Sequence, residues 1–343
     1  MSTNNRVVTF GEVMLRLSPP GYLRLLQTTT LEMTFGGAEA NVAVSLALLG
    51  MEAAFITRLP KNDIADAFIA QVRGLGVDTR SILRGGDRIG VYFVEKGASQ
   101  RASTVLYDRA HSAIAEINPD DLNWDRLLEG ATAFHFTGIT PALSDNAARA
   151  ARMGAEAARN RGIFVSCDLN YRKKLWSREK AGAVMGELLP FVDLCIANEE
   201  DCESVFGISA EGSDLTGGTL DHERYRDVAA QMTDRFGLKE VAITLRESIN
   251  ASRNGWSGML YADGTPYFSR RYEIDIVDRV GGGDSFAAGL LFARLNGRGP
   301  AEAIEFAAAA SCLKHTVVGD FNFVKLAEVE NLLKGDGSGR VQR

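Results

Sequence analysis

The sequence has few residues of the kinds that build disulfide frameworks and zinc sites, with 4 cysteines and 4 histidines in 343 residues. The cysteines show no metal-ligand spacing, and two of them fall inside strand-like runs, so we expect reduced packing residues. The histidines have no nucleophile or metal partner at a recognisable spacing, which favours structural roles. These residues are Cys167, Cys195, Cys202, Cys312, His111, His135, His222 and His315. The sequence therefore identifies no metal ligand among them.

An excess of positive charge and a long apolar run are also missing. The formal net charge is −6 and the isoelectric point is about 5.4, with no basic stripe, so we expect neither a nucleic-acid partner nor a membrane partner. Any anionic substrate must then be held by individual arginines. No stretch of about 18 apolar residues is present, and Met1–Asn5 lacks the apolar core of a signal peptide. We expect a cytoplasmic protein.

Two common nucleotide-binding motifs are absent. After the first predicted strand the chain continues Gly11-Glu12-Val13-Met14-Leu15-Arg16 instead of G-x-G-x-x-G, so the pyrophosphate turn of dinucleotide-dependent dehydrogenases is missing. A Walker A loop is lacking too, which excludes the common P-loop kinases.

Strand-like and helix-like runs alternate along most of the chain, at a spacing typical of parallel β-α-β units. The predicted strands are 6–10, 53–57, 133–137, 163–168, 194–197, 241–245 and 272–277. The predicted helices are 41–49, 64–73, 146–161, 178–189, 221–236 and 301–315. We therefore predict an α/β fold with a doubly wound sheet, in one large domain with an appendage.

Two segments interrupt this alternation. Residues 16–35 contain a Pro19-Pro20-Gly21 turn, and residues 90–110 contain two short β-rich runs that are typical of a hairpin. We interpret the two segments together as a small β lid. The core would then comprise residues 1–15, 36–89 and 111–334, and residues 335–343 would form a disordered tail.

The most informative stretch is Asp278–Gly289, which joins a predicted strand end, three glycines, a carboxylate and a helix start. Glycines let backbone N–H groups approach a phosphate closely, and a helix N-terminus adds partial positive charge. Asp284 stands beside this anion pocket, where a general base could accept a proton from an attacking hydroxyl. The pattern predicts a phosphoryl-transfer site. The alternative is a glycine-rich turn whose aspartate only caps the helix.

Polar residues follow the ends of the predicted strands. They are Glu12, Asp168, Asn170, Asn198 and Arg246. Because ligands of open α/β sheets bind beyond the carboxyl ends of the strands, these residues indicate one rim of a binding site.

A second glycine turn, Gly36–Asn41, also precedes a predicted helix, although a diglycine turn by itself could serve only close packing. Together with the later glycine motif it resembles the ribokinase-like (phosphofructokinase B) sugar kinases over nearly the whole chain. Arg279 and Gly282 stand where that family commonly has threonine and alanine. These departures, with segments 11–18, 168–172, 244–248 and 314–322, are similar to the 2-keto-3-deoxygluconate kinase branch.

The resemblance implies a three-layer α/β/α sandwich with a β-sheet lid that closes over the sugar. It implies transfer of the γ-phosphate of ATP to the 6-hydroxyl of 2-keto-3-deoxygluconate. Asp284 would be the base, and the N–H groups of Gly281, Gly282 and Gly283 would form the anion hole. The residues implied to contact the sugar acid are Gly36, Gly37, Ala40, Tyr92, Tyr107, Arg109, Arg172 and Asp320. Of these, the two arginines would clamp the carboxylate.

For the nucleotide, the resemblance implies ATP with Mg²⁺ bridging its phosphates. The implied nucleotide contacts are Asn170, Asn198, Thr244, Arg246, Gly255, Gly281 and Gly283. The acid nearest the metal stays open, because Asp201 stands where the family usually has glutamate. Asp278 has two open roles, binding a monovalent cation such as K⁺ or fixing the turn. The resemblance also implies a homo-oligomer, in which lid hairpins of different subunits pair and satisfy their exposed strand edges.

Two other functions are weighed against this one. A same-family kinase of a neutral sugar such as fructose or ribose would not need a carboxylate clamp, so the convergence of Arg109 and Arg172 with Gly36 and Asp284 discriminates the two. A catalytically silent sugar sensor is disfavoured by the retention of Asp284 together with all three glycines.

Overall fold

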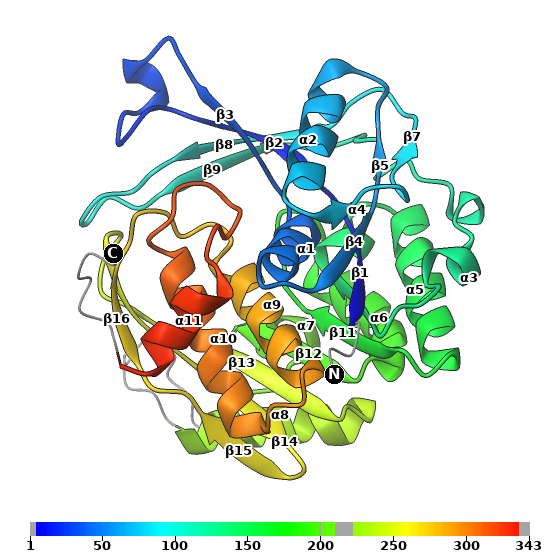
Figure 1. Ribbon diagram of the computed structural model, residues 1–343, viewed down its shortest axis with the longest axis vertical. Helices are drawn as coiled ribbons and strands as arrows, with labels where there is room; N and C mark the ends of the chain where they lie inside the picture. The colour runs from blue at the N-terminus through cyan, green and yellow to red at the C-terminus, as the bar shows by residue number, and fades with distance from the viewer. Residues whose placement is uncertain (1–4, 199, 210–221, 336–343) are drawn as a thin grey trace.

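A computed structural model describes residues 5–198, 200–209 and 222–335, and within them a central sheet lies between two layers of helices (Figure 1). The sheet has 10 strands in the order β15-β14-β13-β12-β11-β10-β1-β4-β6, with β16 paired to β14. Its strands are β1 (Arg6–Phe10), β4 (Glu52–Ile56), β6 (Val77–Asp78), β10 (Ala133–Thr137), β11 (Phe164–Asp168), β12 (Leu194–Asn198), β13 (Glu240–Ser248), β14 (Arg253–Ala262), β15 (Thr265–Phe268) and β16 (Tyr272–Asp275). The predicted three-layer α/β fold is confirmed.

Each face of the sheet is covered by its own helices. One face packs against α1 (Ala38–Leu48), α2 (Asp63–Gly74), α9 (Gly282–Leu295), α10 (Pro300–Lys314) and α11 (Leu326–Leu333). The other packs against α3 (Trp124–Leu127), α5 (Asp145–Asn160), α6 (Arg178–Leu188), α7 (Asp201–Phe206) and α8 (His222–Phe236). Successive residues of β1 enter opposite cores, with Val7 on the α1 side and Val8 on the α5 side. Strands buried on both faces explain the continuous apolar runs in the sequence.

The sheet is mixed rather than uniformly parallel. The pairs from β6 to β13 are parallel, whereas β14 runs antiparallel to β13, β15 and β16. The connection between β14 and β15 is the dipeptide Asp263-Gly264, and both residues have positive φ, 50° and 74°. Such a two-residue turn forces the chain straight back, so no crossover helix fits there.

A second, four-stranded sheet lies beside the carboxyl ends of the central strands (Figure 1). Its order is β3-β2-β8-β9, from β2 (Met14–Ser18), β3 (Glu32–Gly36), β8 (Gly90–Glu95) and β9 (Thr104–Asp108). The predicted hairpin is the antiparallel β8–β9 pair, in which Tyr92 lies opposite Tyr107. We call these four strands the lid sheet.

The remaining elements are short. They are the strand pair β5 (Arg58–Leu59) and β7 (Leu83–Arg84), the helix α4 (Ile139–Leu143), and 3-10 turns at Leu25–Gln27, Pro119–Asp121 and Leu189–Phe191. The predicted tail lies outside the described residues except for Gly335. Among the helices that the structure describes, none has the length and apolarity to cross a membrane.

The N-terminus of α1 is attached to the sheet by a buried carboxylate. Glu39 Oε1 accepts hydrogen bonds from Thr137 N (3.0 Å), Thr137 Oγ1 (2.8 Å) and Thr140 Oγ1 (2.7 Å). Burial raises the pKa of Glu39 to about 7, although these donors pull it down. The contact fixes where α1 begins relative to the end of β10.

The pH dependence of unfolding tests this buried group. Between about pH 4.5 and pH 7 folded Glu39 keeps a proton that the unfolded chain releases, so its contribution to stability falls as pH rises through this window. Glu39→Gln cannot titrate, so the free energy of unfolding of the variant should gain on the wild type by up to about 1.4 kcal/mol per pH unit there. Glu156→Gln, at an exposed position of α5, is the control. If the free energies of unfolding of the wild type and of Glu39→Gln change equally with pH from pH 5 to pH 8, the raised pKa of Glu39 is contradicted.

Candidate active site

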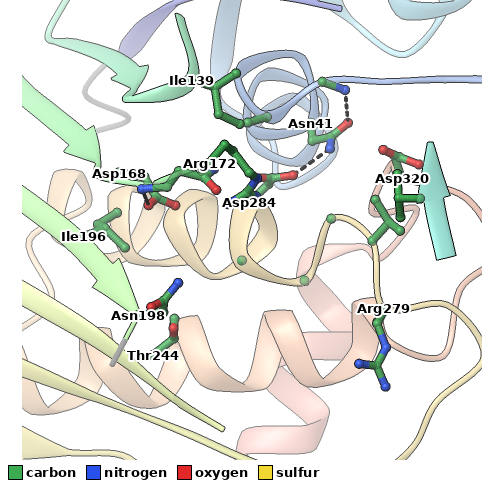
Figure 2. Close-up of a pocket in the computed structure, with 18 of the residues that line it drawn as sticks. Asn41, Ile139, Asp168, Arg172, Ile196, Asn198, Thr244, Arg279, Asp284 and Asp320 are labelled. Carbon is green, nitrogen blue, oxygen red and sulfur yellow. Dashed lines mark hydrogen bonds between the residues drawn. The ribbon is translucent and has the colours of Figure 1, made fainter. Parts of the chain in front are cut away.

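A cavity of about 410 Å³ lies where the carboxyl ends of the central strands meet the lid sheet (Figure 2). The N-terminal turns of α1 and α9 form part of its wall. The predicted site residues that line it are Gly37, Tyr92, Tyr107, Arg109, Asn170, Arg172, Asn198, Thr244, Arg246, Gly281, Gly282, Gly283, Asp284 and Asp320. Residues predicted from motifs far apart in the chain thus meet in one cavity.

Three predicted site residues do not line this cavity. Ala40 is buried inside α1, and Gly36 lies at the end of β3, behind Asp320 and Tyr92. Gly255 is a sheet residue of β14, paired with Glu247 and covered by the guanidinium of Arg271. These positions contribute packing around the site in the structure as it stands.

Asp284, in the first turn of α9, is oriented by a side chain from α1. Asn41 Nδ2 donates to Asp284 Oδ2 at 2.6 Å, and the N–H of Gly37 donates to Asn41 Oδ1 at 3.3 Å (Figure 2). The second contact fixes which end of the amide faces Asp284. Loss of water contact raises the pKa of Asp284 to about 6, whereas the bond from Asn41 and the charges of Arg172 and Lys314 lower it. The carboxylate is therefore mostly ionised at pH 7.

The glycine turn before Asp284 has the geometry that only glycine tolerates. Gly281 has a φ of 86°, and a Cβ there would lie 2.1 Å from the carbonyl oxygen of Asp320. The turn leads into the N-terminus of α9, where the helix dipole favours an anion. The N–H of Gly282 already donates to the carbonyl of Arg279 at 3.3 Å, so one of the three predicted anion-hole donors has a partner.

A buried arginine of the lid sheet joins the glycine turn to Asp320. Arg16 is 2% exposed and donates to Asp320 Oδ1 at 2.7 Å and to Asp278 Oδ2 at 2.6 Å. Asp278 in turn accepts the N–H groups of Val280 and Gly319, each at 3.2 Å. Of the two roles left open for Asp278, these contacts support fixing of the turn.

Asp320 connects this ion cluster to the cavity. Its Oδ2 accepts the hydroxyl of Tyr92 at 2.5 Å, and a Cβ at Gly36 would lie 1.9 Å from the same oxygen. Gly36 is therefore required for the close approach of β3 to Asp320, because any side chain at this position would collide with the carboxylate.

The two arginines predicted to clamp a carboxylate both line the cavity, but each already has neighbours. Arg109 donates through Nε to Glu12 Oε2 at 2.8 Å, and its guanidinium lies 5.3 Å from the centre of the Tyr107 ring. Arg172 donates to the carbonyl of Tyr171 at 3.0 Å and lowers the pKa of Asp284. The rim role expected for Glu12 is wrong, because it is buried as the partner of Arg109 and Ser112.

The carboxyl end of β12 and the adjacent part of β13 also line the cavity. Asn198 Oδ1 accepts the N–H groups of Glu200 and Asp201 at 2.8 and 3.0 Å, so it caps the start of α7. Burial, with a smaller effect from Asp201, raises the pKa of Asp168 well above its usual range. Glu199 lies outside the described residues. Within them no group of three acid, histidine or cysteine side chains is placed to hold a metal alone.

Sequence reasoning missed several residues of this site. Asn41 lies in the second glycine motif, but the sequence pattern indicates only that a helix begins there. Lys314 is buried beside Gly281, donates to the carbonyl of Val317 at 3.2 Å, and has its pKa lowered to about 8 by burial. His315 lines the cavity, with a pKa that burial lowers to about 4. Lys314 and His315 could have been identified as candidates, because the segment 314–322 is one of those that resemble the 2-keto-3-deoxygluconate kinase branch.

Comparison with known proteins gives a consistent picture. A crystal structure of 2-dehydro-3-deoxygluconokinase from Thermotoga maritima is 51% identical, with a TM-score of 0.93, covering 96% of this chain and all of that one. A 2-dehydro-3-deoxygalactonokinase of Haloferax volcanii is 34% identical over 97% of this chain and 98% of its own length. A 2-dehydro-3-deoxygluconokinase of Thermoproteus tenax is 28% identical over 96% of this chain and 94% of its own.

The family assignment rests on nearly the whole chain. Residues 4–324 match the sequence pattern that defines the pfkB family of carbohydrate kinases, and this range includes both glycine motifs and the lid sheet. The chain belongs to the pfkB family and is a carbohydrate kinase.

Proposed function

We propose that the protein transfers the γ-phosphate of ATP to the 6-hydroxyl of 2-keto-3-deoxygluconate, which is the sugar acid also called 2-dehydro-3-deoxygluconate. The observation that carries the proposal is one cavity in which Asp284 and the N-terminus of α9 share a wall with Arg109 and Arg172. The 51% identical kinase from Thermotoga maritima supports the same substrate class.

Asp284 acts as the general base. With a pKa of about 6 it is ionised at neutral pH, yet basic enough to accept a proton from the sugar hydroxyl as the new O–P bond forms. The N–H groups at the start of α9 and the dipole of that helix stabilise the negative charge that develops on the transferring phosphoryl group.

The sugar acid lies between the lid sheet and the α1 turn. Arg109 and Arg172 supply positive charge for the carboxylate, and guanidinium binds a carboxylate through two parallel hydrogen bonds. Tyr92 and Tyr107, whose ring centres are 5.9 Å apart, provide the apolar cover. Asp320 accepts a sugar hydroxyl, while the backbone at Gly37 leaves room for the ring, with Gly36 and Ala40 packed behind.

ATP occupies the end of the cavity formed by Asn170, Asn198, Thr244 and Arg246, with Gly255 behind it and its phosphates toward Gly281 and Gly283. Asp168 and Asp201 line this end of the cavity and could help to hold Mg²⁺, which would neutralise phosphate charge when bound. A requirement for K⁺ stays a prediction. Assays in potassium and in tetramethylammonium buffer check it.

The lid sheet closes over the sugar before transfer, so that water does not compete for the γ-phosphate. ATP hydrolysis without sugar should then be slow.

We place the reaction in the cytoplasm, where thiols stay reduced, in keeping with the four free cysteines.

Substrate turnover tests the proposal directly. With ATP and Mg²⁺, ADP release should be at least about 100-fold more efficient, as kcat/KM, on 2-keto-3-deoxygluconate than on fructose or ribose, because neutral sugars offer no carboxylate to Arg109 and Arg172. Asp284→Asn should lower kcat by about 10²–10⁴-fold. The same assay should include 2-keto-3-deoxygalactonate, because one similar protein is a 2-dehydro-3-deoxygalactonokinase and another is a 2-dehydro-3-deoxygluconokinase. A preference for fructose or ribose would overturn the acid-sugar assignment and favour the neutral-sugar alternative.

The pH profile tests the role of Asn41. Asn41→Ala removes a hydrogen bond that lowers the pKa of Asp284, so the acidic limb of kcat/KM should move from near pH 6 to higher pH by about one unit. Activity should fall more at pH 6.5 than at pH 8. Ser45→Ala is a matched control, because Ser45 Oγ bonds the carbonyl of Asn41 and not Asp284. An unmoved limb in Asn41→Ala would show that Asn41 does not tune the base.

The homo-oligomer is also part of the proposal, with the lid sheet as its interface. Alternate rows across this sheet face opposite ways, and the row containing Arg16, Tyr92 and Tyr107 faces the cavity. The neighbouring row faces away from it and is apolar, and its members in sheet order are Met33, Leu17, Phe93 and Leu106. Met33 and Leu106 are 54% and 49% exposed. A second copy of the chain would cover this row.

Solution mass tests the interface. Leu106→Glu places a charge in the apolar row and should shift the protein toward the monomer mass in light scattering, while leaving the core intact. Ile64→Glu adds the same charge on the exposed side of α2, outside the lid sheet, and should leave the mass unchanged. A monomeric wild type, or an unchanged Leu106→Glu oligomer, would contradict the assignment.

A further inference from the structure

The wall of the cavity below the glycine turn carries two arginines without an acidic partner. Arg246 follows the buried part of β13, and Arg279 precedes the glycine turn. Within the described part of the chain neither forms an ion pair, and Arg279 donates a hydrogen bond from Nη2 to the carbonyl of Ala251 at 2.9 Å. Figure 2 shows the Arg279 side chain pointing away from Asp320 and from Asp284.

The acids of the cavity are engaged elsewhere. Asp320 is paired with Arg16, and Asp284 is bonded to Asn41, while Asp168 lies near Arg172 (Figure 2). Asp278 neighbours Arg279 in sequence, but its carboxylate already accepts Arg16 and two backbone N–H groups. Among the described residues, the acids of the cavity are thus engaged by partners other than these two arginines, and Asp278 offsets part of the charge of Arg279.

Burial lowers the pKa of Arg279, and repulsion by Arg246 lowers it further, whereas the charge of Asp278 raises it. The positive charge of Arg246 thus acts on Arg279 across this wall. His315, on the same wall, is neutral at pH 7 and adds no negative charge. An anion between the two arginines would relieve the repulsion.

A second observation points to a missing ligand on this wall. Asn254 and Trp256 line the cavity and are 1% and 5% exposed, yet among the residues that the structure describes neither Asn254 Oδ1 nor Trp256 Nε1 has a hydrogen-bond partner. Buried polar atoms without a partner are costly, so a bound polar group is expected near them. The unpartnered polar atoms of Asn254 and Trp256 and the positive charges of Arg246 and Arg279 all line this cavity, so both observations favour an anionic ligand there.

We propose that Arg279 is a phosphate-binding residue that contacts the β- or γ-phosphate of a bound nucleoside triphosphate, opposite Arg246. The proposal rests on the proposed kinase function and adds a residue that the family commonly replaces by threonine. Guanidinium stays charged at all working pH values and presents paired donors to phosphate oxygens, which a threonine hydroxyl does not.

The position of Arg279 suits this role, because its carbonyl accepts the N–H of Gly282 at 3.3 Å. Its backbone is thus part of the turn that approaches the transferring phosphoryl group. When the O–P bond to ADP breaks, negative charge grows on the leaving β-phosphate, and a nearby arginine stabilises it.

The competing role is a tether. Arg279 holds the loop at Ala251, and this loop also contacts the tip of the β8–β9 hairpin, where Ser99 accepts the N–H of Ala251 at 2.7 Å and donates to Ser252 Oγ at 2.9 Å. A tether would act on the loop and the lid without regard to how many phosphates the nucleotide carries. This difference separates the two roles.

Equilibrium binding of ATP, ADP and AMP, each with Mg²⁺ and without sugar, tests the proposal by calorimetry. Arg279→Thr should weaken ATP binding by about 10-fold, the loss expected for one charge-assisted hydrogen bond, and leave AMP binding within about 2-fold. Arg279→Lys should recover part of the loss. Arg152→Thr removes one positive charge from the exposed side of α5 and should change nothing.

Each outcome decides the role. Weaker binding of ATP alone assigns the contact to the γ-phosphate, and weaker binding of both ATP and ADP assigns it to the β-phosphate. Equal losses for all three nucleotides, or unchanged binding of all three, would overturn the proposal. The salt dependence of ATP binding should also become shallower in Arg279→Thr. Because no sugar is present, these results stand even if the protein phosphorylates a different sugar.

Discussion

The position of the lid sheet depends on one buried arginine. Arg16 is held between Asp320 and Asp278, which are 304 and 262 residues away in the chain, and all three side chains are almost inaccessible to water. Removing one partner of such a cluster leaves an uncompensated buried charge, which typically costs about 3–5 kcal/mol. Strand β2 of the lid sheet, the glycine turn and Asp320 are therefore fixed relative to one another by the same ion cluster.

The catalytic geometry follows from this arrangement and from the start of α1. Glu39 attaches α1 to the end of β10, which places Asn41 where its amide meets Asp284. Asp284 itself begins α9, next to the turn that Asp278 holds. Two helices on the same face of the sheet thus bring their N-termini together, and both dipoles favour an anion between them. A phosphoryl group is the ligand that such a pair of termini suits best.

Charge is unevenly divided within the cavity. The end near Asp168 and Asp201 is acidic, and its carboxyl groups hold protons more tightly than usual because burial raises their pKa. The wall with Arg246 and Arg279 has a positive excess. The lid side carries Arg109, whose charge Glu12 already balances. The proposed carboxylate contacts, Arg109 and Arg172, and the proposed phosphate contacts, Arg246 and Arg279, are thus different arginines of one cavity.

The sequence by itself determined the fold class, the alternation of strands and helices, the lid hairpin and the two glycine motifs. These features depend on local patterns, because burial of a strand on both faces, helix periodicity and the tolerance of glycine for a φ of 86° are properties of short segments. Asp284 could be singled out for the same reason. Strands β14 and β15 were missed, and although the strand at β16 was predicted, its antiparallel pairing with β14 was not, because the Asp263-Gly264 turn that reverses the chain lies between runs that resemble other strands.

Only the tertiary structure decided which charged groups neutralise one another. Glu12 follows a strand end like a binding residue, yet it is the buried partner of Arg109, and Asp278 holds a turn through an arginine of the lid sheet. The contacts of Asn41 with Asp284 and of Lys314 with the carbonyl of Val317 also appear only in three dimensions. Electrostatic pairing acts over a few ångströms in space between residues hundreds of positions apart, and a single sequence carries no record of those distances.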